Sequence, residues 1–308
     1  MDLDRVCVII PTLNEEEAIG HTIDEFKKEG FNNIFVIDGN STDRTREIAR
    51  KKGAKVEVQS GKGKGQAVAE AFKLVDSDVI ILVDGDGTYP AKDAKKLLDP
   101  IFKDVADHVV GNRLKNYEKG AFTRLNLFGN KIINFIFRLF YGVELYDILS
   151  GYRALRKELY KSVELQKRGF EVETELTVET ISKGFRMVEV PIEYRKRGGK
   201  TKLNPLKDGW RIVSTIYNLL PRYSPGRHMY PFGLIMLFLG FITGIYVVYE
   251  WFHRITHSLL AILTTLLIIA GIQVIIFGFI ADVVFKINAE IRRDLILLRE
   301  EVKKIKRD

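Results

Sequence analysis

Two aspartates follow a strongly apolar stretch of the sequence. Residues 79–83 are all apolar and mostly β-branched, and they run directly into Asp84, Gly85 and Asp86. Such a run is typical of a strand buried on both faces of a parallel sheet, which would deliver both acids to its carboxyl edge. Paired carboxylates suit Mg²⁺ or Mn²⁺, and glycine lets a diphosphate approach the backbone. The pattern therefore predicts a metal–diphosphate site, although an ordinary Asp/Gly turn would have the same local sequence.

Polar residues also follow two further predicted strands, at the points where these strands end. The residues of this kind are Pro11, Thr12, Asn14, Glu15 and Asp38. Asn14 is expected to cap the helix that follows it, which ends near residue 29. Because the carboxyl ends of parallel strands meet at one edge, these side chains are expected to lie beside the two aspartates.

The apolar runs that position these residues alternate between strand and helix patterns. Strands are expected at residues 6–10, 34–37, 55–58 and 79–83. A short polar connection and a helix follow each of the first three, and the two aspartates follow the fourth. This β-α-β alternation predicts an α/β fold with a Rossmann-like doubly wound sheet and right-handed crossovers. Further strands are expected at 107–111 and at 187–194, both at sheet edges.

A glycine-rich loop at residues 61–65 precedes a predicted helix. Lys64 and Gly65 stand at the start of that helix, where a lysine and free backbone amides would suit an anion. The loop lacks the spacing of a Walker A motif, and the first turn of the chain lacks GxGxxG, so a dinucleotide cofactor is not expected.

The ordered segments PTLNEE, DGNSTDRT, GKGKG and DGDGT resemble the nucleotide-sugar domain of the inverting family-2 glycosyltransferases, which have the GT-A fold. The resemblance implies that Pro11, Thr12, Asn14, Glu15 and Asp38 cradle the nucleotide. It also implies that Asp84 and Asp86 hold the metal that bridges the diphosphate. The physical need is charge neutralisation, because the departing nucleoside diphosphate gains negative charge as the sugar C1–O bond breaks.

A second segment, residues 146–153 (YDILSGYR), resembles the Asp-x-x-Ser-Gly-Phe/Tyr-Arg motif of polyprenyl-phosphate (dolichyl-phosphate) sugar synthases in the same family. There the matching serine and nearby arginines bind the lipid phosphate, which points to Ser150, Arg113 and Arg153. Guanidinium groups match phosphate in bidentate geometry. The alternative interpretation is an ordinary surface turn with an ion pair.

A basic stretch at residues 195–203 resembles the arginine-rich loop of the same family. Its residues Arg197 and Lys202 are expected to close over the donor diphosphate and the acceptor phosphate. Glu171, Glu173 and Glu175 lie just upstream, but a phosphate acceptor is already ionised at neutral pH and needs no general base. Their role is left open: they could bind sugar hydroxyls, pair with the basic loop or face solvent.

Composition narrows the class of partner. The 308 residues carry a net charge of +8, yet they contain no zinc-finger spacing, RNA-binding aromatic signature or helix-turn-helix pattern, so nucleic acid is not an expected partner. Anionic lipid and phosphate ligands explain the charge. The single cysteine, Cys7, lies in a predicted strand and is expected to fill the core.

The last third of the sequence predicts a membrane anchor. Residues 230–249 form an uninterrupted apolar run of 20 residues. Residues 259–285 form a second apolar span, in which Gln273 and Asp282 are the only strongly polar members, so each span can cross roughly 30 Å of hydrocarbon. Residues 204–220 form an amphipathic interfacial helix around Trp210, and residues 126–141 read equally as a helix packed on the sheet or one in the interface. The basic tail places the catalytic domain and both termini in the cytoplasm by the positive-inside rule.

The tail also carries an apolar stripe at helical spacing. Its residues are Ile287, Ile291, Leu295, Leu298, Val302 and Ile305. This stripe is expected either to lie on anionic lipid or to pair with another subunit, so a homo-oligomer is one of two alternatives.

The predicted organisation has four parts. These are a cytoplasmic GT-A domain (1–203), an interfacial helix and linker (204–228), two transmembrane helices (229–285) and a basic amphipathic tail (286–308). The expected reaction moves one sugar from UDP-glucose, UDP-N-acetylglucosamine or GDP-mannose to dolichyl or polyprenyl phosphate with inversion. Gly39, Thr88 and Tyr146 depart from mannosyl-type relatives and weaken the GDP-mannose assignment.

Two other functions compete with this interpretation. A processive polysaccharide synthase would carry a Gln-x-x-Arg-Trp motif and more spans, whereas Trp210 follows Asp208 and Gly209. A non-catalytic membrane adaptor that binds nucleotide sugar would have no need of the intact pair Asp84 and Asp86.

Overall fold

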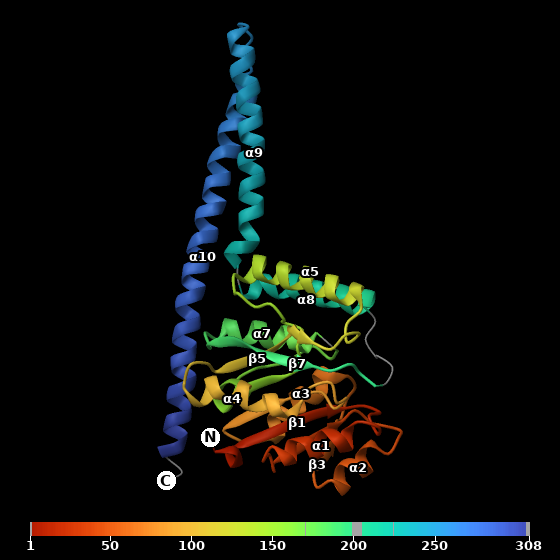
Figure 1. Cartoon of the computed structure of the whole chain (residues 1–308). Helices are drawn as coiled ribbons and strands as arrows, with labels where there is room; N and C mark the ends of the chain where they lie inside the picture. Colours follow the sequence, from red (N-terminus) through yellow and green to blue (C-terminus); the bar gives the residue numbers. More distant parts are fainter. Residues whose placement is uncertain (1, 170, 199–204, 224, 306–308) are drawn as a thin grey trace. The chain divides into compact units, whose positions relative to one another are not determined.

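The computed structural model describes residues 2–169, 171–198, 205–223 and 225–305, and the chain divides into two compact units. The first unit, residues 1–216 and 292–308, contains a seven-stranded mixed sheet (Figure 1). Its strands are β1 (Val6–Thr12), β2 (Ile34–Asp38), β3 (Lys55–Val58), β4 (Val79–Leu82), β5 (His108–Tyr117), β6 (Arg153–Arg156) and β7 (Met187–Tyr194). The order across the sheet is β3-β2-β1-β4-β6-β5-β7.

Helices connect the strands and cover the sheet. They are α1 (Ile19–Lys28), α2 (Thr45–Lys51), α3 (Lys64–Leu74), α4 (Ala94–Phe102), α5 (Arg124–Tyr141), α6 (Lys157–Tyr160), α7 (Val172–Ser182) and α8 (Pro205–Tyr223), with short 3-10 turns at Leu3–Arg5 and Ala91–Asp93. The four predicted N-terminal strands pair in parallel, which confirms the doubly wound arrangement of this half.

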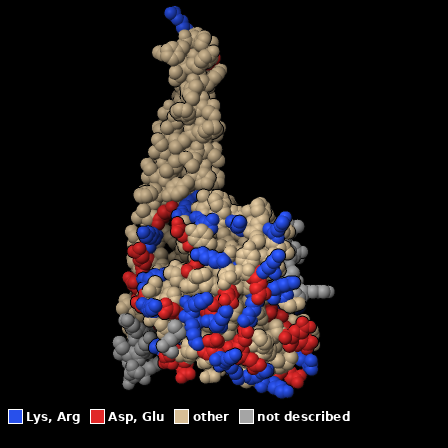
Figure 2. Space-filling view, viewed as in Figure 1, with Lys and Arg blue, Asp and Glu red and all other residues tan. Residues whose placement is uncertain are grey.

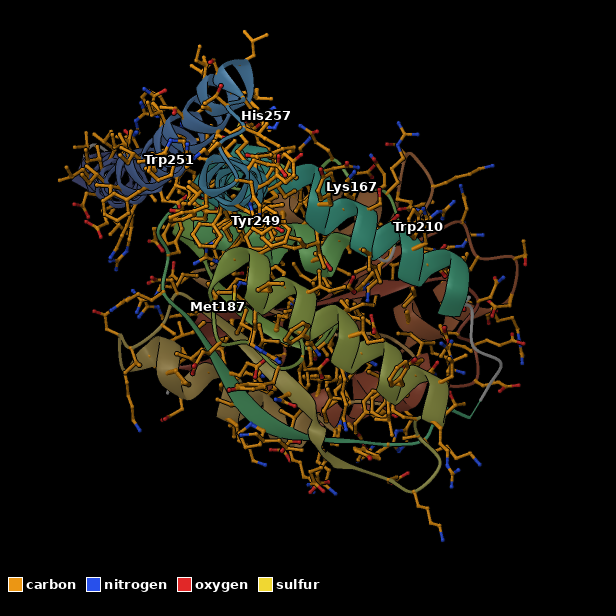
Figure 3. All side chains as sticks on the ribbon, turned by 90° about the horizontal axis from the view of Figure 1, so that it is seen from above. Lys167, Met187, Trp210, Tyr249, Trp251 and His257 are labelled. Atoms are coloured by element: carbon orange, nitrogen blue, oxygen red, sulfur yellow. The ribbon has the colours of Figure 1, made fainter. Side chains whose placement is uncertain are left out.

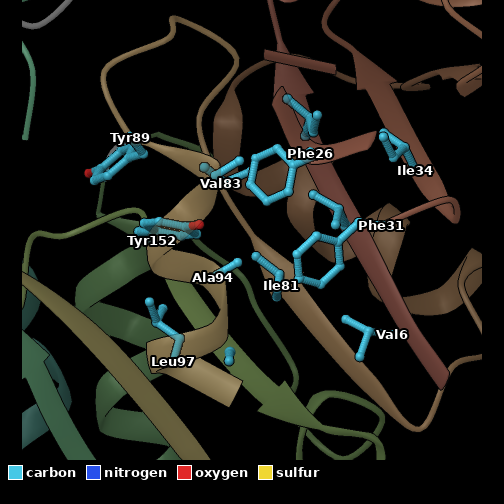
Figure 4. Packing of buried hydrophobic residues seen from close by; sticks show 14 of the residues in the cluster. Val6, Phe26, Phe31, Ile34, Ile81, Val83, Tyr89, Ala94, Leu97 and Tyr152 are labelled. Carbon is cyan, nitrogen blue, oxygen red and sulfur yellow. The ribbon is translucent and has the colours of Figure 1, made fainter. Parts of the chain in front are cut away.

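Two hydrophobic clusters fill the faces of the sheet. Along β1, Val6, Val8 and Ile10 pack into one cluster, while Cys7 and Ile9 pack into the other, because successive side chains of a strand point to opposite faces. Figure 4 shows the first cluster, where Phe26 packs edge-on against Phe31 with ring centroids 5.7 Å apart. Cys7 is buried as expected, and burial raises the pKa of its thiol to about 12, so it stays an uncharged core residue.

The structure corrects three local predictions. Asn14 does not cap a helix: α1 begins at Ile19, and the Asn14 side chain instead accepts a hydrogen bond from the Thr42 amide at 2.8 Å. β5 lies inside the sheet rather than at its edge, whereas β7 lies at the edge as predicted. β6 was not predicted at all, and it runs antiparallel to both of its neighbours.

Helices α5 and α8 are amphipathic, and they lie side by side in Figures 1 and 3. On α5, Ile133, Phe137 and Tyr141 are buried, and the Tyr141 hydroxyl donates a 2.9 Å hydrogen bond to the Ile216 carbonyl of α8. The opposite face of α5 exposes Leu125, Phe128, Ile132, Phe135 and Leu139, and α8 exposes Trp210 and Tyr217. One face of α5 therefore packs on the protein, and the other exposes apolar side chains, so its position in a membrane interface stays a prediction.

The second unit, residues 217–291, contains most of two long helices, α9 (Pro225–Phe252) and α10 (Ser258–Ile305). Within them, Met229–Phe252 and Ser258–Arg299 are long and apolar enough to span a membrane, and Figure 2 shows almost no charged side chains over most of this unit. The helices pack closely through glycines. A Cβ on Gly233 would lie 2.9 Å from the Gly271 carbonyl oxygen, and Gly226 and Gly240 face α10 in the same way.

Candidate active site

Asp84 and Asp86 lie just beyond the carboxyl end of β4, as predicted. The Lys64 ammonium at the start of α3 lies 2.5 Å from Asp84 Oδ1 and 2.5 Å from Glu173 Oε1 on α7. Burial alone would lower the pKa of Lys64, but the two carboxylates raise it well above its usual value, so the ammonium stays charged. One cation thus connects three elements at the edge of the sheet.

Asp86 is held by a different set of groups. Its Oδ1 accepts hydrogen bonds from the Thr88 hydroxyl at 2.6 Å and the Thr88 amide at 3.1 Å. Its Oδ2 lies 3.3 Å from Arg197, and the same guanidinium donates to Glu15 Oε1 at 2.5 Å. Burial, and then the charge of Asp84, raise the pKa of Asp86. The ionised pair is therefore costly without additional positive charge.

This pair of acids fits a divalent metal ion. A cation held by both carboxylates would offset the cost of burying the charge of Asp86 and the repulsion between Asp86 and Asp84. Within the described residues, no group of three or more His, Cys, Asp and Glu side chains is arranged to hold a metal. Asp84 and Asp86 are the residues that would hold such an ion.

The strand-end residues predicted to bind the nucleotide do gather at this edge. Pro11 and Thr12 end β1, and Asp38 ends β2 directly beside Thr12. Asp38 is fully buried and accepts hydrogen bonds from the Ser41 hydroxyl at 2.5 Å, the Ser41 amide at 2.8 Å and the Thr12 hydroxyl at 3.3 Å. Asp38 therefore orders the two loops that surround it.

The glycine-rich loop differs from its prediction as a simple anion site. The Gly65 amide, in the first turn of α3, donates to the Arg168 carbonyl at 3.0 Å, so the protein already uses this amide. A Cβ on Gly63 or Gly65 would lie within about 2 Å of the carbonyl oxygens of Arg168 and Lys167, respectively. These glycines allow close packing of residues 167–168 over the loop, whereas the Lys64 side chain does reach the site.

The segment predicted to bind the acceptor also reaches Asp84. Because β6 is antiparallel, Arg153 pairs with Leu82, and the residues just before β6 lie at the carboxyl end of β4. A Cβ on Gly151 would lie only 2.7 Å from Asp84 Oδ2 and 3.1 Å from Lys64 Nζ. The YDILSGYR segment thus packs directly against the predicted metal ligands.

Arg113 faces this segment from β5. Its guanidinium donates to both oxygens of Asp147, at 2.9 and 2.7 Å, and packs on the rings of Phe122 and Tyr194. Glu189 on β7 in turn accepts from the amides of Tyr146 and Asp147. Neither Asp147 nor Glu189 was predicted to have a role in the site. An acid in the middle of the edge strand VEVPIEY was the available signal for Glu189.

Arg153 is not placed for the role first assigned to it. Its side chain is fully buried, and it donates to the carbonyls of Ser150 and Ile148 and to the Thr177 hydroxyl. All of these partners belong to the protein, so Arg153 supports the loop and α7 rather than presenting donors to a phosphate. Ser150 is likewise fully buried. Lys202 lies outside the described residues.

The three glutamates near α7 have different surroundings in the structure. Glu173 joins the site through Lys64, and its Oε2 is buried with no hydrogen-bond partner in the described part of the chain. Glu175 accepts from the amides of Gln166 and Lys167, which holds the segment that packs on the glycine-rich loop. Glu171 is the residue that precedes the first turn of α7.

Comparison with known proteins agrees with this arrangement. Residues 7–163 match the model of glycosyl transferase family 2, and residues 202–284 match the family-2 C-terminal transmembrane region. Glycosyltransferase AglJ of Haloferax volcanii is 41% identical over 93% of this chain and 96% of its own length. A dolichyl-phosphate hexose transferase of the same organism is 37% identical over 69% of this chain and 92% of its own length.

Solved structures give the same fold. Glucosyl-3-phosphoglycerate synthase of Mycobacterium tuberculosis, in complex with Mn²⁺ and UDP-glucose, superposes with a TM-score of 0.57 at 23% identity, over 71% of this chain and 78% of that one. The chain belongs to glycosyl transferase family 2. It is a glycosyltransferase with a GT-A-like sheet and two C-terminal helices that could span a membrane, and its relatives include dolichyl-phosphate sugar transferases.

Proposed function

We propose that this enzyme transfers one sugar from a nucleotide-sugar donor to polyprenyl (dolichyl) phosphate with inversion at the anomeric carbon. The observation that carries the proposal is the packing of Gly151 against Asp84, because it brings the acceptor-type segment to the donor-type carboxylates. The relatives named as dolichyl-phosphate hexose transferase and dolichol-phosphate mannosyltransferase support the choice of acceptor.

The reaction needs charge control more than proton transfer. An oxygen of the acceptor phosphate attacks the sugar C1, and the bond from C1 to the nucleoside diphosphate breaks with its electron pair going to the diphosphate. A divalent metal held by Asp84 and Asp86, when bound, neutralises charge on that leaving group. The acceptor oxygen is ionised at neutral pH, so no base has to remove a proton from it.

Side chains of this enzyme supply the other contacts. Arg113, fixed by Asp147 and two aromatic rings, is the proposed donor to the acceptor phosphate. Arg197 already lies beside Asp86 and is proposed to move onto the diphosphate when the donor binds. The buried Oε2 of Glu173 has no hydrogen-bond partner among the described residues, and it is proposed to accept a hydrogen bond from a sugar hydroxyl of the donor.

The membrane arrangement follows from the acceptor. A polyprenyl phosphate stays in the bilayer, so its transferase must work at the surface. We propose that Met229–Phe252 and Ser258–Phe285 cross the membrane, with the catalytic domain and both termini in the cytoplasm. The exposed apolar residues of α5 and α8 are proposed to enter the interface beside the lipid phosphate.

A transfer assay tests the proposal. The purified protein in detergent is given polyprenyl phosphate and, separately, labelled UDP-glucose, UDP-N-acetylglucosamine and GDP-mannose, each with Mg²⁺, Mn²⁺ or EDTA. We expect label from one donor to enter the lipid as a single sugar, and Asp86→Ala or EDTA to reduce the rate on the order of 10²–10³-fold. The matched control Asp99→Ala changes a half-exposed aspartate on α4 and keeps the rate.

Two outcomes would overturn the proposal. Label that appears in a polymer would indicate a processive synthase, and donor hydrolysis or donor binding without transfer to any polyprenyl phosphate would indicate a different acceptor.

A further inference from the structure

The part of α10 that follows the apolar span carries a heptad pattern. With Asn288 at position a, the next a and d positions are Ile291, Leu295, Leu298 and Val302, spaced alternately by three and four residues. We call these five residues the tail seam. Its four apolar members lie on one continuous helix, and each is 50–55% exposed. An exposed apolar seam with this period is the pattern that pairs helices in coiled coils.

The opposite side of the same helix is already occupied. Ile296 and Leu297 are partly buried against the hydrophobic cluster that contains Cys7, Phe72 and Leu176. Arg293 lies 3.7 Å from Asp107. These three residues fall at positions b, c and f of the heptad, which are on the other face of the helix from a and d. Leu295, Leu298 and Val302 of the tail seam therefore lie on the side of the helix opposite to the one that packs on this hydrophobic cluster.

Charges beside the tail seam are sorted by sign. The e positions hold Arg292 and Arg299, whereas the g positions hold Asp294 and, one heptad later in the sequence, Glu301. Arg292, Asp294 and Arg299 are exposed, and none of these three makes an ion pair with another described residue. In a parallel pair of helices, each g residue faces the e residue of the next heptad in the partner, so Asp294 would face Arg299 of the second copy. An antiparallel pair would place acid against acid.

We propose that a second copy of this chain covers the tail seam, and that the two α10 helices form a parallel two-stranded coiled coil. Two copies inserted in one membrane have the same orientation, so their tails are necessarily parallel. Asn288 at an a position favours a fixed register and a two-stranded assembly, at a cost in stability. The acids at the g positions disfavour the alternative that the seam lies on anionic lipid. This inference does not depend on which donor or acceptor the enzyme uses.

Disulfide cross-linking of the full chain in vesicles tests the contact. Cys7 is buried, so an introduced cysteine is the reactive thiol. We expect Leu298→Cys to give a covalent dimer under mild oxidation, because the same d position of two parallel helices meets at the seam. The matched control Glu290→Cys changes an exposed c position and should remain monomeric on the gel. Equal cross-linking of both variants would mean random collision and would overturn the proposal.

Charge reversal tests the orientation. We expect Asp294→Arg alone, or Arg299→Asp alone, to weaken self-association about ten-fold, because each turns two attractive pairs into repulsive ones. The two single variants mixed together should associate with each other, and the double variant should regain the self-association of the unchanged chain. Energy transfer between differently labelled copies measures association of the two single variants, of their mixture and of the double variant. The melting temperature of each variant is the control for folding.

The outcomes separate the alternatives. If the single reversals associate as the unchanged chain does, or if the mixture fails to recover, the parallel pairing is wrong. If Leu298→Cys stays monomeric but becomes protected from an aqueous maleimide only in vesicles with anionic lipid, the seam binds lipid instead, and the proposal fails.

Discussion

Lys64 and Arg197 place positive charge beside the two aspartates of the site before any ligand binds. Its ammonium lies between Asp84 and Glu173, while Arg197 lies between Asp86 and Glu15. Each of the two proposed metal ligands thus has its own cation within the chain. A bound metal would have to share Asp84 with Lys64, so small displacements at this point should have large effects on the rate.

Gly151 is the most direct test of that sensitivity. A Cβ there would lie 2.7 Å from Asp84 Oδ2, so Gly151→Ala must shift the carboxylate. We expect kcat to fall by about 10–100-fold with little change in melting temperature, since misplacing a catalytic group by about 1 Å costs this much. The matched control is Gly129→Ala on α5, where a Cβ meets nothing within 4 Å. An unchanged kcat in Gly151→Ala would contradict the close contact.

His108 gives the fold a dependence on pH. Burial, and then the Arg153 guanidinium, hold the pKa of His108 well below its usual value, so the folded state keeps the ring neutral. The unfolded state takes up a proton near pH 6.5, so stability is complete above that pH and is lost as the pH falls. We expect the free energy of unfolding to fall by up to ~1.4 kcal/mol per pH unit from this group between about pH 7 and pH 5. The melting temperature, measured over this range, should fall with it.

Two histidine variants isolate this effect. His108→Gln should flatten the pH dependence of the melting temperature, whereas His21→Gln, which changes an exposed histidine, should leave the slope unchanged. The same slope in His108→Gln and in the unchanged protein would show that other groups cause the dependence.

At the scale of elements, α5 and α8 present exposed apolar side chains, among them Phe128, Leu139 and Trp210. Trp210 on α8, labelled in Figure 3, is 75% exposed. In protein reconstituted into vesicles, we expect lipids brominated near the headgroup to quench the fluorescence of Trp210. Trp251→Phe leaves Trp210 as the single tryptophan of the chain, so the signal is specific. Absence of quenching would contradict the interfacial position.

The elements also show which predictions the sequence permits. The strands β1 to β4 and the two apolar helices are encoded by local runs of apolar residues, which a single pass along the chain detects. β6 was missed because its four residues, Arg153 to Arg156, begin and end with arginine and contain no alternation or apolar run. Its buried arginine is satisfied by loop carbonyls and a threonine that only the folded chain brings together.

The site follows the same division. The residue types at the strand ends predicted Asp84, Asp86 and the neighbouring loops, because parallel strands gather their carboxyl ends at one edge. The pairing of Lys64 with Glu173, and of Arg113 with Asp147, joins residues that are far apart in the chain. No local pattern reports such pairs. The Gly65 amide was assigned to an anion for the same reason, since its partner, Arg168, is distant in sequence.

At the scale of the whole molecule, the proposed topology places the link between α9 and α10 on the far side of the membrane from the catalytic domain. We expect Thr256→Cys in this link to react with an impermeant maleimide in intact cells, and Asp99→Cys on α4 to react only after the membrane is opened. Buried Cys7 contributes little background. Labelling of both variants, or of neither, in intact cells would contradict the proposed insertion.

The antiparallel strand β6 has a consequence for the chain as it is being made. β4 ends at Leu82, and its partner on one side, β6, begins at Arg153, so about 70 residues must emerge from the ribosome before that edge of β4 is paired. Because synthesis adds roughly 5–20 residues per second, this edge of β4 stays unpaired for several seconds. During that interval the nascent half-sheet is open to pairing with other chains, so slower translation through residues 83–152 should lower the yield of folded enzyme.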